Sequence, residues 1–311
     1  MKTVMNKLKK VLNSKLFQLS FSAILIFVAF RRVNVGHLLN EVHQAPWWVV
    51  IVLLVYMAFS MVLGGLRWSI LVLGKVKLSD VLAFTKATYA GSFYSLFFPS
   101  SVGGDLLKWT SLTKKYPEMS KLKLMGSALI DRVIGFSAFS IAALIALIAG
   151  KILKYQFPEI LFWLFLGINF ALIVFYVLVF TIDFEKMLSK FKFLNKLLEI
   201  VDLLKNSNKQ RIIICFLISL ISEPVWMLMT WFSSLTFKAH IKLLQVFIFM
   251  PIISLILVLP ISWAGFGARE NLFLIFFGQL GYQSEKLLLV SAFGGILGIL
   301  NALIGGLVLL F

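Results

Sequence analysis

Long apolar runs separated by short basic segments fill most of this chain. A helix needs about 20 apolar residues to cross a bilayer. Backbone polar groups in lipid must also pair within the chain, which leaves helices and closed barrels. The runs are too long and too continuous for barrel strands, so we predict spanning helices. Their predicted positions are residues 16–30, 47–73, 124–149, 160–181, 212–237, 243–259 and 287–311.

The hydrophobic pattern changes in two other segments. Thr, Tyr, Ser, Gly and Lys interrupt the apolar side chains of residues 81–98, so this segment cannot face lipid all round and should be buried among other helices. Residues 182–210 place apolar side chains at steps of three and four. That spacing predicts an amphipathic helix on the cytoplasmic membrane surface.

The apolar pattern breaks twice, at Pro- and Gly-containing stretches that end in charge. Residues 96–108 read LFFPSSVGGDLLK, and residues 259–270 read LPISWAGFGARE. Two helix breaks of this kind are the pattern expected where a membrane transporter holds its substrate. The residues predicted to act as hinges there are Pro99, Pro260, Gly265 and Gly267.

Composition agrees with a membrane protein. The 311 residues are 60% hydrophobic and only 14% charged, a mixture that soluble folds do not use. The net charge of +17 would suggest nucleic acid on a soluble protein, but here Lys and Arg lie mainly between the apolar runs. That arrangement fits the positive-inside rule and anionic lipid headgroups, so we expect no nucleic-acid partner. It also predicts a multi-pass protein of the cell membrane with a cytoplasmic N-terminus.

The charge distribution implies a topology. Because residues 75–80 and 108–123 both lie on the predicted cytoplasmic side, the segment between them must enter the membrane and return. We therefore predict a re-entrant hairpin at about 81–115, and a second at about 258–281 that enters from the opposite face. Three spans separate the hairpins, so the two halves would be inverted repeats. The predicted fold is an all-α polytopic membrane protein, a single domain over residues 1–311, with about seven or eight transmembrane helices plus two re-entrant helical hairpins.

Four charged motifs follow one another along the chain. Arg67-Trp68 closes the second span, PSSVGGD covers residues 99–105, Asp131-Arg132 lies in the next span, and GFGARE covers residues 265–270. In this order the motifs resemble the lysylphosphatidylglycerol synthase transmembrane-region family, often called flippase-like, over nearly the whole chain. Fused members of that family carry a soluble synthase domain after this region. We expect a stand-alone membrane domain here, and the resemblance implies lipid translocation, not aminoacyl transfer.

The first break supplies a candidate phosphate site. The N-terminus of a half-helix inside the membrane attracts anions, because its backbone N–H groups are unpaired. Hydroxyl groups and free N–H groups at this break could therefore bind the phosphate of a lipid. The residues in question are Ser100, Ser101, Gly103 and Gly104.

The second break supplies a cation. Arg269 could bind lipid phosphate bidentately. A buried Arg in lipid is costly and usually paired, so the alternative is a structural ion pair of Arg269 with Asp105 or Glu270. Both acids are also candidates for charge coupling.

Charged residues inside the spans are further candidates. Asp131 and Arg132 are neighbours on a predicted helix and point apart, so they need different partners. We expect Arg132 and Arg67 to bind substrate, although Arg67 could also snorkel to the interface. Glu223 precedes Pro224 in an apolar run, where a carboxylate is a candidate proton-coupling site or a partner for Arg. Asp131 and Glu223 complete the predicted charge-coupling set.

The favoured function is translocation of a phosphate-bearing lipid, either a phospholipid or a polyprenyl-phosphate-linked lipid. The alternatives are a membrane-embedded lipid-linked glycosyltransferase, an accessory subunit of a lipid-modifying synthase and a non-transporting scaffold. The three histidines, His37, His43 and His240, fall in predicted loops and form no metal motif, and no Walker loop is present. We therefore expect no enzyme activity, cofactor or metal. The expected partners are a membrane lipid and anionic headgroups, and a homodimer is left open.

Overall fold

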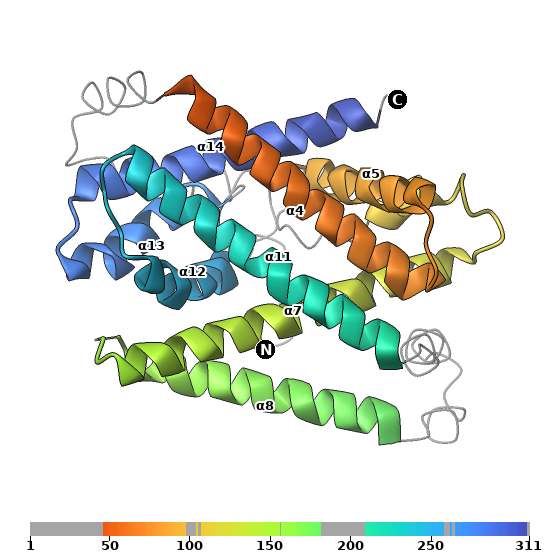
Figure 1. Ribbon diagram of the computed structural model, residues 1–311, viewed down its shortest axis with the longest axis horizontal. Coiled ribbons are helices and arrows are strands. Elements are labelled where there is room, and N and C mark those ends of the chain that lie inside the picture. The colour runs from red at the N-terminus through yellow and green to blue at the C-terminus, as the bar shows by residue number, and fades with distance from the viewer. Residues whose placement is uncertain are drawn as a thin grey trace, which may run out of the picture. The chain divides into compact units, whose positions relative to one another are not determined.

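The computed structural model describes residues 46–97, 104, 107–155, 157–181, 209–257, 262 and 265–309 (Figure 1). Every regular element among these residues is helical. The predicted span at 16–30, nearly all of the amphipathic segment, most of the first helix break and the beginning of the second lie outside the described residues. In chain order the elements are α4 (Trp47–Leu73), α5 (Leu78–Ser95), η1 (Lys108–Leu112), α7 (Lys121–Ile152), α8 (Glu159–Thr181), α11 (Lys209–Thr236), α12 (Leu243–Leu257), α13 (Ala268–Phe276), η4 (Gly278–Leu280) and α14 (Ser284–Val308).

Five of these helices, α4, α7, α8, α11 and α14, are long and apolar enough to cross a membrane, and α12 is a shorter apolar helix. This confirms an all-helical, multi-pass membrane protein. Helix α4 has the predicted bounds, whereas α7 begins three residues before the predicted start. The side chain of Ser120 accepts a hydrogen bond from the backbone N–H of Lys123, and this cap explains the earlier start.

Helix α5 is buried as its mixed pattern predicts, with Phe84, Thr85, Ala87, Tyr89 and Ala90 inside the protein. The chain divides into two compact units, each made of several segments. Unit 1 comprises residues 1–58, 92–105 and 225–311, and unit 2 comprises residues 59–91 and 106–224.

An aromatic and aliphatic core organises unit 2, in which α7 and α8 run side by side (Figure 1). Trp68 of α4 is fully buried, and its ring meets that of Phe84 edge to face, with 4.9 Å between the centroids. The indole Nε1 donates a 3.0 Å hydrogen bond to the hydroxyl of Ser127 in α7. Trp68 therefore joins α4 to both α5 and α7 close to Arg67, the adjacent charged residue.

Helices α4 and α5 approach each other closely at one glycine. A Cβ placed on Gly65 would lie 2.6 Å from the backbone N and Cα of Thr85. Only a residue without a side chain allows two backbones to come this close. Gly65 thus determines how α5 packs on α4 within unit 2.

Unit 1 contains α12, α13 and α14, and α13 packs against both of the others. Its core includes Phe249 of α12, which stacks on Phe276 and meets Phe277 edge to face. Helix α13 begins at a tight turn, because Gly267 has φ +77° and its backbone N–H donates a 2.6 Å hydrogen bond to the Glu270 carboxylate. A side chain at position 267 would be strained in that conformation.

A small polar network ties the start of α5 to the segment before α7. The Asp80 carboxylate accepts hydrogen bonds from the Lys77 backbone N–H at 3.0 Å and from the Tyr116 hydroxyl at 2.7 Å, and Lys115 lies 3.5 Å away. These interactions, led by the backbone bond, hold the pKa of Asp80 below its ordinary value of 3.8. Burial, followed by the bond to Asp80, raises the pKa of the Tyr116 hydroxyl.

The close approach at Gly65 gives the first prediction. Replacing Gly65 by Ala should force α4 and α5 apart and lower the free energy of unfolding by about 1–3 kcal/mol, the usual cost of overpacking. The measurement is the thermal unfolding of the detergent-solubilised protein. Gly167→Ala in α8 is the matched control, because a Cβ there meets nothing within 4 Å. Equal unfolding temperatures for the two variants would contradict this account.

The second prediction concerns pH. The lowered pKa of Asp80 means that its stabilising contribution is complete at neutral pH and is lost as the pH falls below 3.8 towards the folded-state value. Asp80→Asn should therefore unfold at a lower temperature than the parent protein between neutral pH and about pH 5. The difference should shrink at more acidic pH. A difference that stays constant down to the most acidic condition tested would show that the Asp80 charge is not its origin.

Candidate functional site

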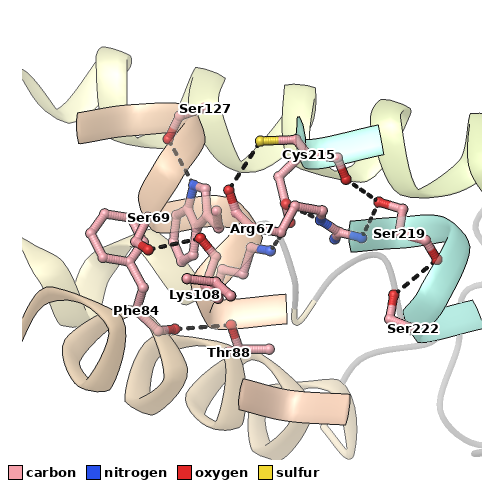
Figure 2. Close-up of polar contacts among 12 residues, drawn as sticks. Arg67, Ser69, Phe84, Thr88, Lys108, Ser127, Cys215, Ser219 and Ser222 are labelled. Atoms are coloured by element: carbon pink, nitrogen blue, oxygen red, sulfur yellow. Dashed lines mark hydrogen bonds and ion pairs between the residues drawn. The ribbon is translucent and has the colours of Figure 1, made fainter. Parts of the chain in front are cut away.

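Three charged side chains meet inside unit 2, and we call them the ionic cluster: Arg67 of α4, Lys108 of η1 and Asp131 of α7. Arg67 Nε lies 2.6 Å from Asp131 Oδ1, and Lys108 Nζ lies 2.8 Å from Asp131 Oδ2. The side chains of Lys108 and Asp131 are 5% and 2% exposed, and that of Arg67 is 12% exposed. Figure 2 shows Arg67 between Lys108 and the α11 residues Cys215 and Ser219. One carboxylate thus holds two cations, one on each oxygen.

Neighbouring groups fix the two cations in place. Arg67 Nη1 donates a 2.9 Å hydrogen bond to the hydroxyl of Ser219, and the Cys215 thiol donates to the Arg67 carbonyl at 3.3 Å (Figure 2). Lys108 Nζ also lies 4.4 Å from the centroid of the Trp68 ring, a distance typical of a cation–π interaction. Gly135 leaves room for the guanidinium, because a Cβ there would lie 3.0 Å from Arg67 Nη1.

Two further charged residues of unit 2 interact with this cluster. Glu223 of α11 is attracted electrostatically by Arg67 and by Arg132 of α7. Together with the ionic cluster they make three bases and two acids, so the group carries one excess positive charge when every member is ionised. Bases therefore outnumber acids among these five residues within apolar helices, and this balance favours the binding of an anion over that of a cation.

The structure brings together several residues that the sequence singles out, namely Arg67, Asp131, Arg132 and Glu223. Asp131 is paired with Arg67 and Lys108, so it does find partners other than its neighbour Arg132, as expected. Arg67 does not snorkel, because its side chain is largely buried and bonded to Asp131 and Ser219.

Lys108 is the functional candidate that sequence reasoning missed. The charge count assigns Lys108 to a cytoplasmic loop with the other basic residues of 108–123, but the structure buries it against Asp131 and Trp68. The signal available in the sequence was its position directly after the first helix break, together with an unpaired acid in the following span.

The second motif lies in unit 1 and is arranged differently. The Glu270 carboxylate is used in the turn at the start of α13, where its Oε2 accepts from Gly267 N–H. Within the described part of the chain, Arg269 Nη1 is buried and has no hydrogen-bond partner. The guanidinium lies between two glycines: a Cβ on Gly265 would lie 3.2 Å from Arg269 Nη2, and a Cβ on Gly295 would lie 2.5 Å from Nη1.

The other predicted residues stand as follows. Gly104 is buried, and Gly265 and Gly267 both have positive φ, at +80° and +77°. Their role as hinges stays a prediction. Among the residues that the structure describes, no group of three or more His, Cys, Asp or Glu side chains could hold a metal ion. The predicted residues outside the described part of the chain are Pro99, Ser100, Ser101, Gly103, Asp105 and Pro260.

The ionic cluster gives the third prediction. Asp131→Ala leaves two buried cations without a counter-charge and should lower the free energy of unfolding by about 3–5 kcal/mol. Lys108→Met keeps the pair between Arg67 and Asp131 and should cost clearly less. Thermal unfolding of both variants in detergent measures the difference. If both variants lose the same stability, Asp131 is not the charge that holds the cluster together.

The chain was compared with known families, curated proteins and solved structures. The family model described as lysylphosphatidylglycerol synthase TM region matches residues 15–305, which include all four charged motifs. No curated protein and no solved structure matches the chain. Because the family match covers nearly the whole sequence, the chain belongs to the family of lysylphosphatidylglycerol synthase transmembrane regions.

Proposed function

We propose that the protein translocates a phosphate-bearing lipid, a phospholipid or a polyprenyl-phosphate-linked lipid, across the cell membrane. The observation that carries this proposal is the ionic cluster of Arg67, Lys108 and Asp131 inside helices that are otherwise apolar. Ionisable residues within membrane-spanning segments are expensive, and they commonly mark the pathway of a substrate or an ion. Membership of a family named for a lipid synthase supports a lipid as the substrate.

The charge balance of the site suits a phosphodiester. Three bases against two acids make the site attractive to an anion, and a lipid phosphate supplies the negative charge. Arg67 has five N–H donors, of which the structure assigns some to Asp131 and Ser219. The remaining donors could bind phosphate oxygens while Asp131 keeps the guanidinium oriented.

Binding at this site would lower the cost of moving the headgroup through the membrane. The phosphate would exchange water for the cations of unit 2 while the acyl or prenyl tails stay in the bilayer. Asp131 and Glu223 would balance the positive charge before the lipid arrives and after it leaves. We include in this proposal the two re-entrant hairpins, at about 81–115 and 258–281, entering from opposite faces, and a cytoplasmic N-terminus.

The fourth prediction tests translocation directly. Proteoliposomes containing a phospholipid with a fluorescent headgroup are treated with a membrane-impermeant quencher, and the rate at which inner-leaflet lipid becomes accessible is measured. Arg67→Gln removes the positive charge and should slow this rate about tenfold or more, because hydrogen bonds to charged groups contribute about 1.5–3 kcal/mol.

The matched control is Lys151→Gln at the end of α7. Lys151 is also basic, but its side chain is 39% exposed and its partner Glu159 is 79% exposed, so this variant should keep the parent rate. Size-exclusion chromatography checks that both variants are folded. A folded Arg67→Gln protein that translocates lipid at the parent rate would remove the central role given to this residue. Absence of translocation by the parent protein would refute the function itself.

A further inference from the structure

Glu223 is an acid in the middle of a spanning helix. It lies about 21 Å from one end of α11 and about 20 Å from the other, at 1.5 Å per residue. The hydrocarbon core of a bilayer is about 30 Å thick, so Glu223 lies well inside it when α11 crosses the membrane. Helix α11 carries no other charged residue after Arg211 in its first turn.

Glu223 lies on the side of α11 that faces the ionic cluster. Ser219 comes four residues earlier, so the two side chains are neighbours on one face of the helix. The Ser219 hydroxyl accepts a 2.9 Å hydrogen bond from Arg67 Nη1 (Figure 2). Glu223 is therefore one turn away from the bond that joins α11 to the cluster, and Arg67 and Arg132 both attract its carboxylate.

The two acids of this region are held in different ways. Each oxygen of Asp131 contacts a cation, and the side chain is 2% exposed. Within the described part of the chain, no residue donates a hydrogen bond to the Glu223 carboxylate or forms an ion pair with it, and the two arginines attract it over a longer distance. Glu223 is also partly exposed, so a proton can reach it. The charge of Glu223 can therefore change without the loss of a direct contact.

That charge depends on the two arginines. An ionised carboxylate without hydrogen bonds is costly among apolar helices, so the attraction of nearby cations is what supports it. An anion that binds to these cations neutralises them and removes that support. The carboxylate then takes up a proton from water and becomes a neutral carboxyl group, which does not repel the anion.

Among the described residues of unit 2, no other group around the cluster suits this exchange. The bases of the ionic cluster and Arg132 keep their positive charges over the ordinary pH range. Asp131 already has a cation on each oxygen, and the Cys215 thiol donates its hydrogen to the Arg67 carbonyl. His240, the histidine that the structure describes, belongs to unit 1.

We propose that Glu223 takes up a proton from water when an anion binds at the ionic cluster and returns it when the anion leaves, so that the anion and the proton move together. This inference rests on the proposed function and adds the coupling ion. Linkage makes the effect reciprocal, because an anion that favours protonation of Glu223 is itself bound more tightly by the protonated protein. The affinity for a lipid phosphate therefore falls as the pH rises.

The exchange takes place beside a proline. Pro224 has no backbone N–H, so the carbonyl of Leu220 receives no hydrogen bond from it. The chain passes from unit 2 into unit 1 directly after Pro224. A change of charge at Glu223 therefore acts on the turn of α11 that has one backbone hydrogen bond fewer than the others, where the helix bends most easily.

Binding of dioctanoylphosphatidylmethanol to the detergent-solubilised protein tests this inference, because the charge of this phosphodiester does not change near neutral pH. Its affinity is measured by isothermal titration calorimetry at about pH 5 and about pH 8. The parent protein should bind it about tenfold more weakly at the higher pH, a coupling of ordinary size between two sites. In weakly buffered solution with a pH indicator, the parent should also take up protons as the lipid binds.

Glu223→Gln keeps the shape of the side chain but cannot ionise. It should bind the lipid equally well at both pH values, with the affinity that the parent has at the lower pH, and it should take up no protons. Glu223→Met serves in its place if that variant does not fold. The matched control is Glu159→Gln at the start of α8, where the acid is 79% exposed, and it should keep the pH dependence and proton uptake of the parent.

Binding by the parent that does not depend on pH, or unchanged proton uptake by a folded Glu223→Gln protein, would overturn the inference. Translocation is measured separately in proteoliposomes. Binding coupled to proton uptake in a protein that does not translocate lipid would refute the proposed function and leave the role of Glu223 standing, whereas translocation with binding independent of pH would do the reverse. Absence of binding at both pH values would refute both.

Discussion

A carboxylate inside apolar helices needs counter-charges from the protein itself. In unit 2 this carboxylate is that of Asp131. Each of its oxygens contacts a cation, one from α4 and one from η1. Ser219 of α11 then binds the guanidinium of Arg67, so segments from four parts of the chain depend on one acid. The free-energy cost of removing two opposite charges from water is offset only when the ion pair has good geometry and good hydrogen bonding. The surrounding residues Trp68, Cys215 and Gly135 provide that geometry.

The charged residues of unit 1 have different partners from those of unit 2. Glu270 sits at the start of α13 and bonds to the backbone of Gly267, a turn that the positive φ of this glycine makes available. The acid is therefore used locally and leaves the neighbouring Arg269 with a donor that no described residue accepts. The two units therefore differ: both oxygens of Asp131 contact cations from other elements, while Glu270 bonds to the backbone of its own turn.

Much of the helical framework could be predicted from the sequence, because a long apolar run in lipid forms a spanning helix. The bounds of α4 follow from the hydrophobic pattern alone, and the mixture of polar and apolar residues in α5 predicts that this helix is buried. The partners of Asp131 could not be predicted from the sequence. The hydrophobic pattern shows that a charged residue lies within a span, but it does not show which distant segment contacts that residue. Lys108 shows this limit clearly. As one lysine in a basic segment it looks like a loop cation, and only the fold of η1 against α7 turns it towards Asp131.

Glycine carries the same ambiguity in this chain, and only the packing around each glycine resolves it. In sequence, Gly65, Gly294, Gly295 and Gly298 are equivalent small residues within apolar helices. In space, Gly65 admits the backbone of α5 and Gly295 admits the guanidinium of Arg269, whereas Gly294 and Gly298 admit no described atom. The cost of a larger side chain therefore differs among these four positions, because it depends on the atoms that surround each glycine and not on the sequence next to it.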